Sequence, residues 1–227
     1  MLRLANFATD QGDAKLAMRL YQLAQDEDRK LRVAGQKSDF RLSDFAILVT
    51  QSYLTAHDYN DALLYLDELR KDKPEWLEPY TLMFDSMRAV ADVGVHNDTE
   101  AEMYVNNLIH ASNMRPDNLL IIANRLISHG APELGQRLLI EANRMDPHNQ
   151  AILAQLIAVN LQLGYSDNMD QNIHALLQTR RPPPELLYDA YRQIGSDHFI
   201  FVPDREKVLA ELGNYLNSAV ANRRVAY

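Results

Sequence analysis

The sequence contains no cysteine among its 227 residues, and only eight glycines, nine prolines and one tryptophan. Without cysteine, disulfide scaffolds, thiolate zinc sites and thiol nucleophiles are excluded. No apolar run approaches the roughly 18 residues of a membrane-spanning helix, and no signal peptide is recognisable. We therefore expect these residues to be soluble, in the cytoplasm or in the periplasm.

Positive charge is also scarce, with 23 lysines and arginines against 31 aspartates and glutamates and a formal net charge of -8. A nucleic-acid or phosphate site normally needs a basic face, so this balance disfavours such partners. The sequence has no phosphate loop, dinucleotide fingerprint, zinc-protease pair or nucleophile elbow. We expect no catalytic residue, no cofactor and no metal.

What the chain does contain is a recurring pattern rich in helix-forming residues. A turn residue is followed five positions later by a residue that is usually small, and seven positions further by another. A period of roughly 30 to 45 residues is typical of stacked helical arrays, so the sequence predicts an all-α protein. The pattern occurs at Gly12, Ala17 and Ala24; at His57, Ala62 and Leu69 before Pro74; at Gly130, Gly135 and Ala142 before Pro147; and at Gly164, Met169 and Leu176 before Pro182.

Each repeat divides into two helices around its turn, and the repeats join into one predicted domain, 1–227. Near-identical strings at 114–118 and 145–149 lie 31 residues apart and mark the two ends of one repeat. Extra residues fall between Asp28 and Leu42 and around 92–98, where we expect loops, and Tyr104 then takes a place where a small residue is expected. The predicted boundaries are 1–42, 43–76, 77–115, 116–147 and 148–182, followed by a terminal cap at 183–222.

The predicted cap is a helix pair, with a short helix from Glu185 to Ile194 and a final helix from Pro203. The apolar run from Phe199 to Val202 between them is more often buried under such a cap than exposed. One apolar face and one polar face suit the end of an array. The apolar stripe of the final helix consists of Val208, Leu209, Leu212, Tyr215, Leu216 and Ala219.

These residues resemble the tetratricopeptide repeat family, whose unit is about 34 residues of paired antiparallel helices. The resemblance covers 1–182, where 12–24 and 58–74 match the family's second helix and small residues let the helices approach closely. The third and fifth units depart from it, with Tyr104 and Met169 at small-residue places. The resemblance implies a right-handed superhelical solenoid of about five units, whose first helices line a concave groove for a peptide or partner helix.

The groove positions that the resemblance implies lie on the first helix of each unit. Their amides can bind an extended peptide through its backbone amide and carbonyl groups. We expect Asp85, Arg88 and Asn124 to be exposed together, with Arg137 and Glu141 on the outer side. The expected groove residues are Asn6, Asp10, Gln51, Thr55, Asp85, Arg88, Asn124, Ser128, Ala158 and Gln162.

Other polar residues are interpreted first as surface residues. The basic stretch Arg29, Lys30, Arg32, Lys37 and Arg41 is interleaved with acidic residues, which favours a solvated helix end over a docking loop for an acidic partner. The seven histidines are scattered along the chain, and the carboxylates of 85, 100 and 102 are typical of solvated helix faces rather than of an acid and base pair.

The leading hypothesis is a non-catalytic scaffold or adaptor that binds another protein or peptide. Two alternatives stay open: an enzyme or enzyme subunit on a helical scaffold, and a helical-repeat RNA-binding protein, which the acidic balance disfavours. Self-association into a homo-oligomer is compatible with each of these hypotheses. Met1 lies inside a helical pattern with no N-cap before it, so the chain is either a piece of a larger protein or begins with a helix at Met1.

Overall fold

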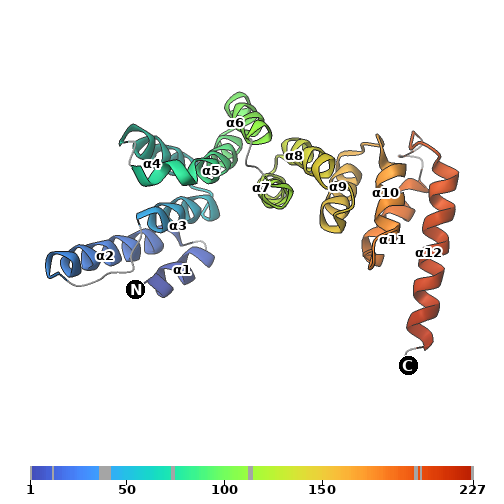
Figure 1. The fold of residues 1–227 in the computed structure, drawn as a ribbon, viewed down its shortest axis with the longest axis horizontal. Helices are drawn as coiled ribbons and strands as arrows, with labels where there is room; N and C mark the ends of the chain where they lie inside the picture. Colours follow the sequence, from blue (N-terminus) through green and yellow to red (C-terminus); the bar gives the residue numbers. More distant parts are fainter. Residues whose placement is uncertain are drawn as a thin grey trace. The chain divides into compact units, whose positions relative to one another are not determined.

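The computed structural model is all-helical within the part of the chain that it describes, which comprises residues 2–11, 13–35, 42–72, 75–111, 115–196, 199 and 201–225. Twelve α-helices and one 3-10 helix lie in this part, and no strand occurs there. Helices that are neighbours in sequence pack in pairs, as the sequence predicts (Figure 1).

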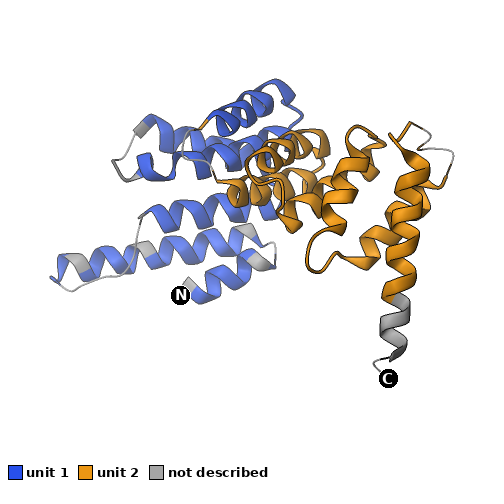
Figure 2. Cartoon of the chain, turned by 45° about the vertical axis from the view of Figure 1, so that its right-hand side comes forward, with its two compact units in different colours: residues 1–110 blue, residues 111–227 orange. Residues whose placement is uncertain are grey.

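The chain divides into two compact units, residues 1–110 and residues 111–227, which we describe separately (Figure 2). Unit 1 contains α1 (Leu2–Asp10), α2 (Ala14–Val33), α3 (Leu42–Thr55), α4 (Tyr59–Asp72), the 3-10 helix η1 (Glu75–Tyr80), α5 (Thr81–Gly94) and α6 (Asp98–His110). Unit 2 contains α7 (Pro116–Ser128), α8 (Pro132–Met145), α9 (Gln150–Leu163), α10 (Met169–Leu177), α11 (Pro184–Ile194) and α12 (Arg205–Val225).

The turns inside five of the helix pairs share one backbone hydrogen bond. In each, an N–H donates to the carbonyl five residues earlier over 2.8–2.9 Å, which closes the end of the first helix. The preceding residue is left-handed wherever it is described, with φ of 60° at His57 and His96, 90° at Gly130 and 72° at Gly164. The donor and acceptor pairs are Asp13 and Ala8, Asp58 and Tyr53, Asn97 and Asp92, Ala131 and Leu126, and Tyr165 and Asn160.

The residue four positions after the hydrogen-bond donor of the turn is buried in each of these five pairs. At Gly135 a Cβ atom would lie 2.9 Å from the carbonyl oxygen of Ala123 and 2.5 Å from the side chain of Ile127, so α7 and α8 approach too closely for a larger residue. Gly12 and Pro74, which belong to the predicted pattern, lie outside the described residues. The buried positions are Ala17, Ala62, Ala101, Gly135 and Met169.

The predicted register of the third pair is wrong. Helix α5 continues to Gly94 and its turn is centred on His96, so fully buried Ala101, and not Tyr104, fills the small position. The additional residues form η1 before α5 instead of a long turn after it. The sequence does carry a signal for this register, because His96, Ala101 and Leu108 repeat the spacing of His57, Ala62 and Leu69, and histidine is among the residues enriched in left-handed conformations.

Part of the segment between the first and second pairs is also helical. Helix α2 continues to Val33, where a loop was expected from Asp28. Lys30 forms an ion pair with Glu27 at 2.7 Å there, as expected for a solvated helix end. Of the basic stretch, Lys37 and Arg41 lie outside the described residues.

The carboxyl-terminal helix pair packs as predicted from its apolar stripe. Val208 and Leu212 of α12 are buried in a core that includes Leu176 of α10 and Leu187 of α11. Before α12, Phe199 and Val202 are buried, which confirms the expectation for these two residues, whereas Phe201 is 81% exposed. Ile200 lies outside the described residues.

Candidate functional site

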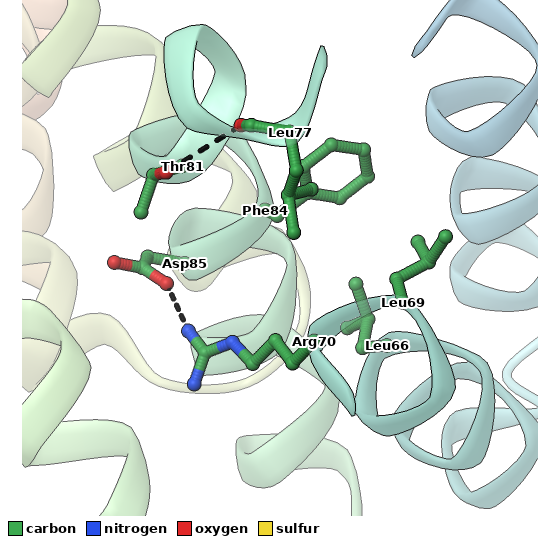
Figure 3. Close-up of a pocket in the computed structure, with 7 residues that line it drawn as sticks. All are labelled: Leu66, Leu69, Arg70, Leu77, Thr81, Phe84 and Asp85. Atoms are coloured by element: carbon green, nitrogen blue, oxygen red, sulfur yellow. Dashed lines mark hydrogen bonds and ion pairs between the residues drawn. The ribbon is translucent and has the colours of Figure 1, made fainter. Parts of the chain in front are cut away.

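An apolar pocket of about 240 Å³ opens between α4, η1 and α5 in unit 1. Helix α4 contributes Leu66 and Leu69, η1 contributes Leu77, and α5 contributes Phe84. Figure 3 shows these apolar side chains around the hollow, with polar groups at one edge. Most of the pocket wall is hydrocarbon, which favours an apolar group as its occupant.

The edge of this pocket carries an ion pair between helices. Arg70 of α4 donates to the carboxylate of Asp85 on α5, and the Arg70 guanidinium also donates to the hydroxyl of Tyr104 on α6 over 2.5 Å. The other polar residue of the wall, Thr81, donates to the backbone oxygen of Glu78 over 2.9 Å. The charged groups at the pocket edge are therefore already held by partners on three helices.

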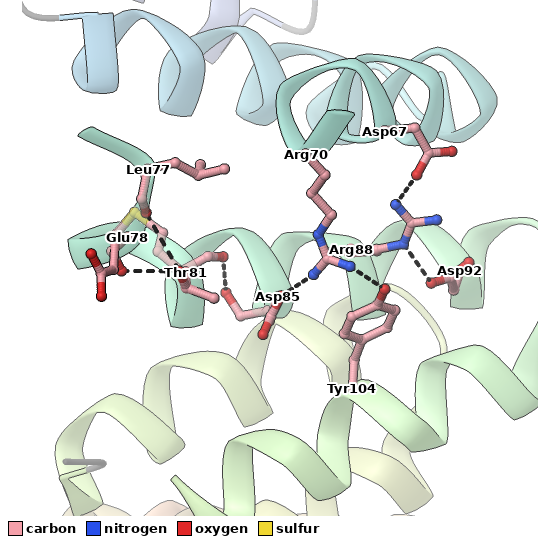
Figure 4. Close-up of polar contacts among 11 residues, drawn as sticks. Asp67, Arg70, Leu77, Glu78, Thr81, Asp85, Arg88, Asp92 and Tyr104 are labelled. Atoms are coloured by element: carbon pink, nitrogen blue, oxygen red, sulfur yellow. Dashed lines mark hydrogen bonds and ion pairs between the residues drawn. The ribbon is translucent and has the colours of Figure 1, made fainter. Parts of the chain in front are cut away.

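A second arginine extends the same network along α5 (Figure 4). Arg88 pairs with Asp67 of α4 and lies 3.8 Å, Nε to Oδ2, from Asp92 one turn further along α5. Its guanidinium carbon lies 5.5 Å from the centre of the Tyr104 ring, and that of Arg70 lies 4.9 Å from it. Both cations are within the distance at which an aromatic ring attracts them.

Burial dominates the electrostatics of this network. It raises the pKa of the Asp85 carboxyl above its ordinary value, and Arg70 opposes that rise through its charge and hydrogen bond. Burial likewise raises the pKa of Asp92, against the opposing charge of Arg88. The arginines therefore stabilise carboxylates that would otherwise be costly to keep ionised away from water.

Two of the predicted groove residues, Asp85 and Arg88, belong to this network and not to an open surface. Asp85 is 8% exposed, so its expected exposure is wrong. The shift of register in the third pair is the cause: the positions of α5 that correspond to the predicted residues of the other units are Val90 and Gly94. Val90 is buried and Gly94 is half-buried.

The other predicted groove residues occupy two positions on the first helix of a pair, counted back from the turn residue. Six residues before the turn residue, Asn6, Gln51 and Asn124 are exposed. Ala158 at the same position is half-buried. Two residues before the turn residue, the exposed residues are Thr55, Ser128 and Gln162.

In unit 1, one of these amides is partly engaged by its neighbours. Asn6 accepts a hydrogen bond from Tyr21 over 2.9 Å, and the same hydroxyl contacts Thr9. Asp10 is the last residue of α1, and its side chain is outside the described part of the structure. In unit 2, the expected outer residues Arg137 and Glu141 on α8 are half-buried.

Sequence reasoning missed Arg70 and Tyr104. The signal that was available is the helical spacing of opposite charges: Asp67 and Arg70 lie three residues apart on α4, and Asp85 and Arg88 lie three apart on α5. Such spacing places charges on one helix face, but it does not say that the two faces meet.

Among the described residues, no cluster of three or more histidine, aspartate or glutamate side chains is arranged to hold a metal ion. In the same residues, none of the helices is both long enough and apolar enough to cross a bilayer. No model of a known protein family matches the chain, and no curated protein matches it.

Proposed function

We propose that this protein is a non-catalytic scaffold of the tetratricopeptide type, which binds a peptide or a helix of another protein. The observation that carries this proposal is the apolar pocket between α4, η1 and α5. A partner would insert one large aliphatic or aromatic side chain there, between Leu66, Leu77 and Phe84. Buried apolar anchors of this kind supply most of the binding energy in many protein interfaces.

The ion pairs beside the pocket support this proposal because they fix its shape. Arg70 and Arg88 join α4, α5 and α6 through Asp85, Asp67 and Tyr104. A pocket that is already formed costs less to occupy than one that must be ordered on binding. We assign these charges to positioning and not to catalysis, since each is bound to a neighbour.

The exposed polar residues of the first helices in unit 1 supply a surface for the partner's main chain, and unit 2 carries residues of the same kind. Gln51 and Thr55 in unit 1, and Asn124, Ser128 and Gln162 in unit 2, recur at two corresponding positions and are exposed. Amide side chains can donate to a backbone carbonyl and accept from a backbone N–H, so they bind main chain independently of the partner's sequence.

A pocket-filling substitution tests the proposal. With the full chain as bait, partners are identified by affinity capture and mass spectrometry, and their affinity is then measured by calorimetry for Thr81→Phe. Thr81 is exposed at the pocket wall, so an aromatic ring there occupies the hollow without replacing a core residue. We expect binding to weaken by at least about 2 kcal/mol.

Glu78→Phe is the matched control, because Glu78 is exposed in η1 and does not line the pocket. It should leave the affinity unchanged. Equal binding by both variants would contradict the pocket as the anchor site.

The main-chain surface has its own test. Gln51→Ala with Thr55→Ala should weaken the same complex by about 1–3 kcal/mol through lost hydrogen bonds. The control pair, Asn60→Ala with Asn107→Ala, removes two exposed amides from the second helices α4 and α6. If the control pair abolishes binding while the first pair is silent, the partner uses another face.

A further inference from the structure

A second hollow, of about 420 Å³, lies in unit 2 between α8, α9 and the turn that leads into α10. It differs from the first in chemistry, because amide side chains from all three helices converge on it. Two aliphatic residues, Ile140 and Leu156, and one aromatic residue, Tyr165, complete most of its wall. The amides are those of Gln136, Asn143, Asn160, Asn168, Gln171 and Asn172.

Two of the amide residues are buried, and the amide oxygen of a third, half-buried residue has no partner among the described residues. Asn160 and Asn172 are 3% and 7% exposed. Gln136 Nε2 donates to Asn160 Oδ1 over 2.6 Å, which orients that pair. Asn143 Oδ1 is shielded from solvent and accepts no hydrogen bond within the described structure. A buried acceptor without a donor is costly, so a ligand hydroxyl or N–H that the Asn143 amide turns to meet supplies a hydrogen bond that the free protein lacks.

The charge of the hollow restricts that ligand. Among the described residues that line it, Asp167 is the only one that carries a charge at neutral pH, and none is a lysine or an arginine. A phosphate or carboxylate would find no cation there, and a cation would find one exposed carboxylate. A neutral ligand with many hydrogen-bonding groups fits the lining best.

We propose that this amide hollow, defined by the residues of α8, α9, α10 and the turn before α10 named above, is a binding site for a neutral saccharide. Adjacent sugar hydroxyls both donate and accept, so an amide can accept from one hydroxyl and donate to the next, and the Asp167 carboxylate can accept from two. The ring of Tyr165, which is 47% exposed at the rim, offers an apolar face to the C–H side of a sugar ring.

This site is distinct from the pocket of unit 1 and does not depend on the proposed function. Its residues all lie in unit 2, whereas the apolar pocket is formed by α4, η1 and α5. A failed partner capture would therefore leave the saccharide proposal standing, and the reverse also holds.

The test uses the full chain and a panel of neutral disaccharides: cellobiose, maltose, lactose and di-N-acetylchitobiose. Ligand-observed saturation-transfer NMR detects weak binding, and titration gives the affinity. We expect at least one disaccharide to bind with a dissociation constant near about 1 mM. If none binds, or if only peptides occupy this hollow, the proposal is overturned.

Two variants locate the bound sugar. Tyr165→Ala removes the exposed ring, and Asn143→Leu replaces the unpartnered amide by an apolar side chain of similar size. Each should weaken binding roughly tenfold or more, which is about 1.4 kcal/mol. Gln178→Ala is the matched control for the amide loss, since Gln178 is exposed directly after α10 and does not line the hollow.

Asn143→Leu also has a readout that separates binding from folding. Because its oxygen is unpaired, the substitution should leave the melting temperature of the free protein unchanged or raise it, while sugar binding is lost. Retention of sugar affinity in both Tyr165→Ala and Asn143→Leu would overturn the site. A fall in melting temperature with unchanged affinity would show that Asn143 serves folding alone, and would equally overturn it.

Discussion

A Cβ atom added to Gly94 would lie 2.2 Å from the ring of Tyr59, so the end of α5 and the start of α4 meet at a contact that leaves no room for a methyl group. Gly94 is helical and its φ is not left-handed, so the need for glycine there comes from packing and not from backbone conformation. The same close approach occurs between α7 and α8 at Gly135.

Gly94→Ala should therefore destabilise unit 1 by about 1–3 kcal/mol through overpacking, despite the better helix propensity of alanine. Chemical denaturation followed by circular dichroism measures the change. Gly213→Ala is the control, because a Cβ atom there would lie 3.7 Å from Tyr191, an ordinary contact. The control should be neutral or slightly stabilising, and a similar loss in both variants would refute the close contact.

Ala62→Arg should cost about 3 kcal/mol or more, because Ala62 is fully buried five residues after the turn at His57. Asn60→Arg places the same charge on the exposed face of α4 and should change little. Thermal unfolding compares the two. A melting temperature of the Ala62 variant close to that of the parent would mean that this seam is loosely packed.

Arg70→Met should destabilise the protein by about 1–3 kcal/mol at neutral pH, because it leaves the Asp85 carboxylate buried without its main partner. Burial already raises the pKa of Asp85 above its unfolded value, and loss of Arg70 raises it further. A folded pKa above the unfolded pKa means that the folded state binds the additional proton, so stability falls as pH rises through that interval. The loss caused by Arg70→Met should therefore shrink as the pH is lowered towards the unfolded pKa of aspartate.

Denaturant unfolding at neutral and mildly acidic pH measures this dependence. Adding Asp85→Asn to the Arg70→Met variant removes the titrating group and should remove the pH dependence of the loss. A loss that is equal at both pH values would show that Arg70 acts through packing against Tyr104 and not through the charge of Asp85.

Leu212→Ala should destabilise unit 2 by about 2–5 kcal/mol, since Leu212 of α12 is fully buried against α10 and α11. Leu64→Ala, at a leucine that is largely exposed on α4, should have little effect. Thermal unfolding of both variants gives the comparison. A small effect at Leu212 would mean that α12 contributes little to the core of its unit.

From the sequence alone, the helix pairs of the fold could be predicted. The turn residues at 57, 130 and 164, the buried residues five positions after them and the apolar stripe of the last helix all depend on interactions within a few residues of the chain. Helical periodicity and a hydrogen bond that spans five residues are local, so both can be recognised from the sequence.

Tertiary structure alone decided the candidate site. The left-handed turn at His96 repeats the spacing of the turn at His57, so the register itself is present in the sequence, but the packing of α5 decides that Asp85 and Arg88 lie in a network within unit 1 and not on the expected surface. The pairing of Arg70 with Asp85 and Tyr104 depends on how α4, α5 and α6 cross, as does the amide hollow around Asn143. Helix spacing says which side chains share a face, but only the packing of one helix on another decides which faces meet.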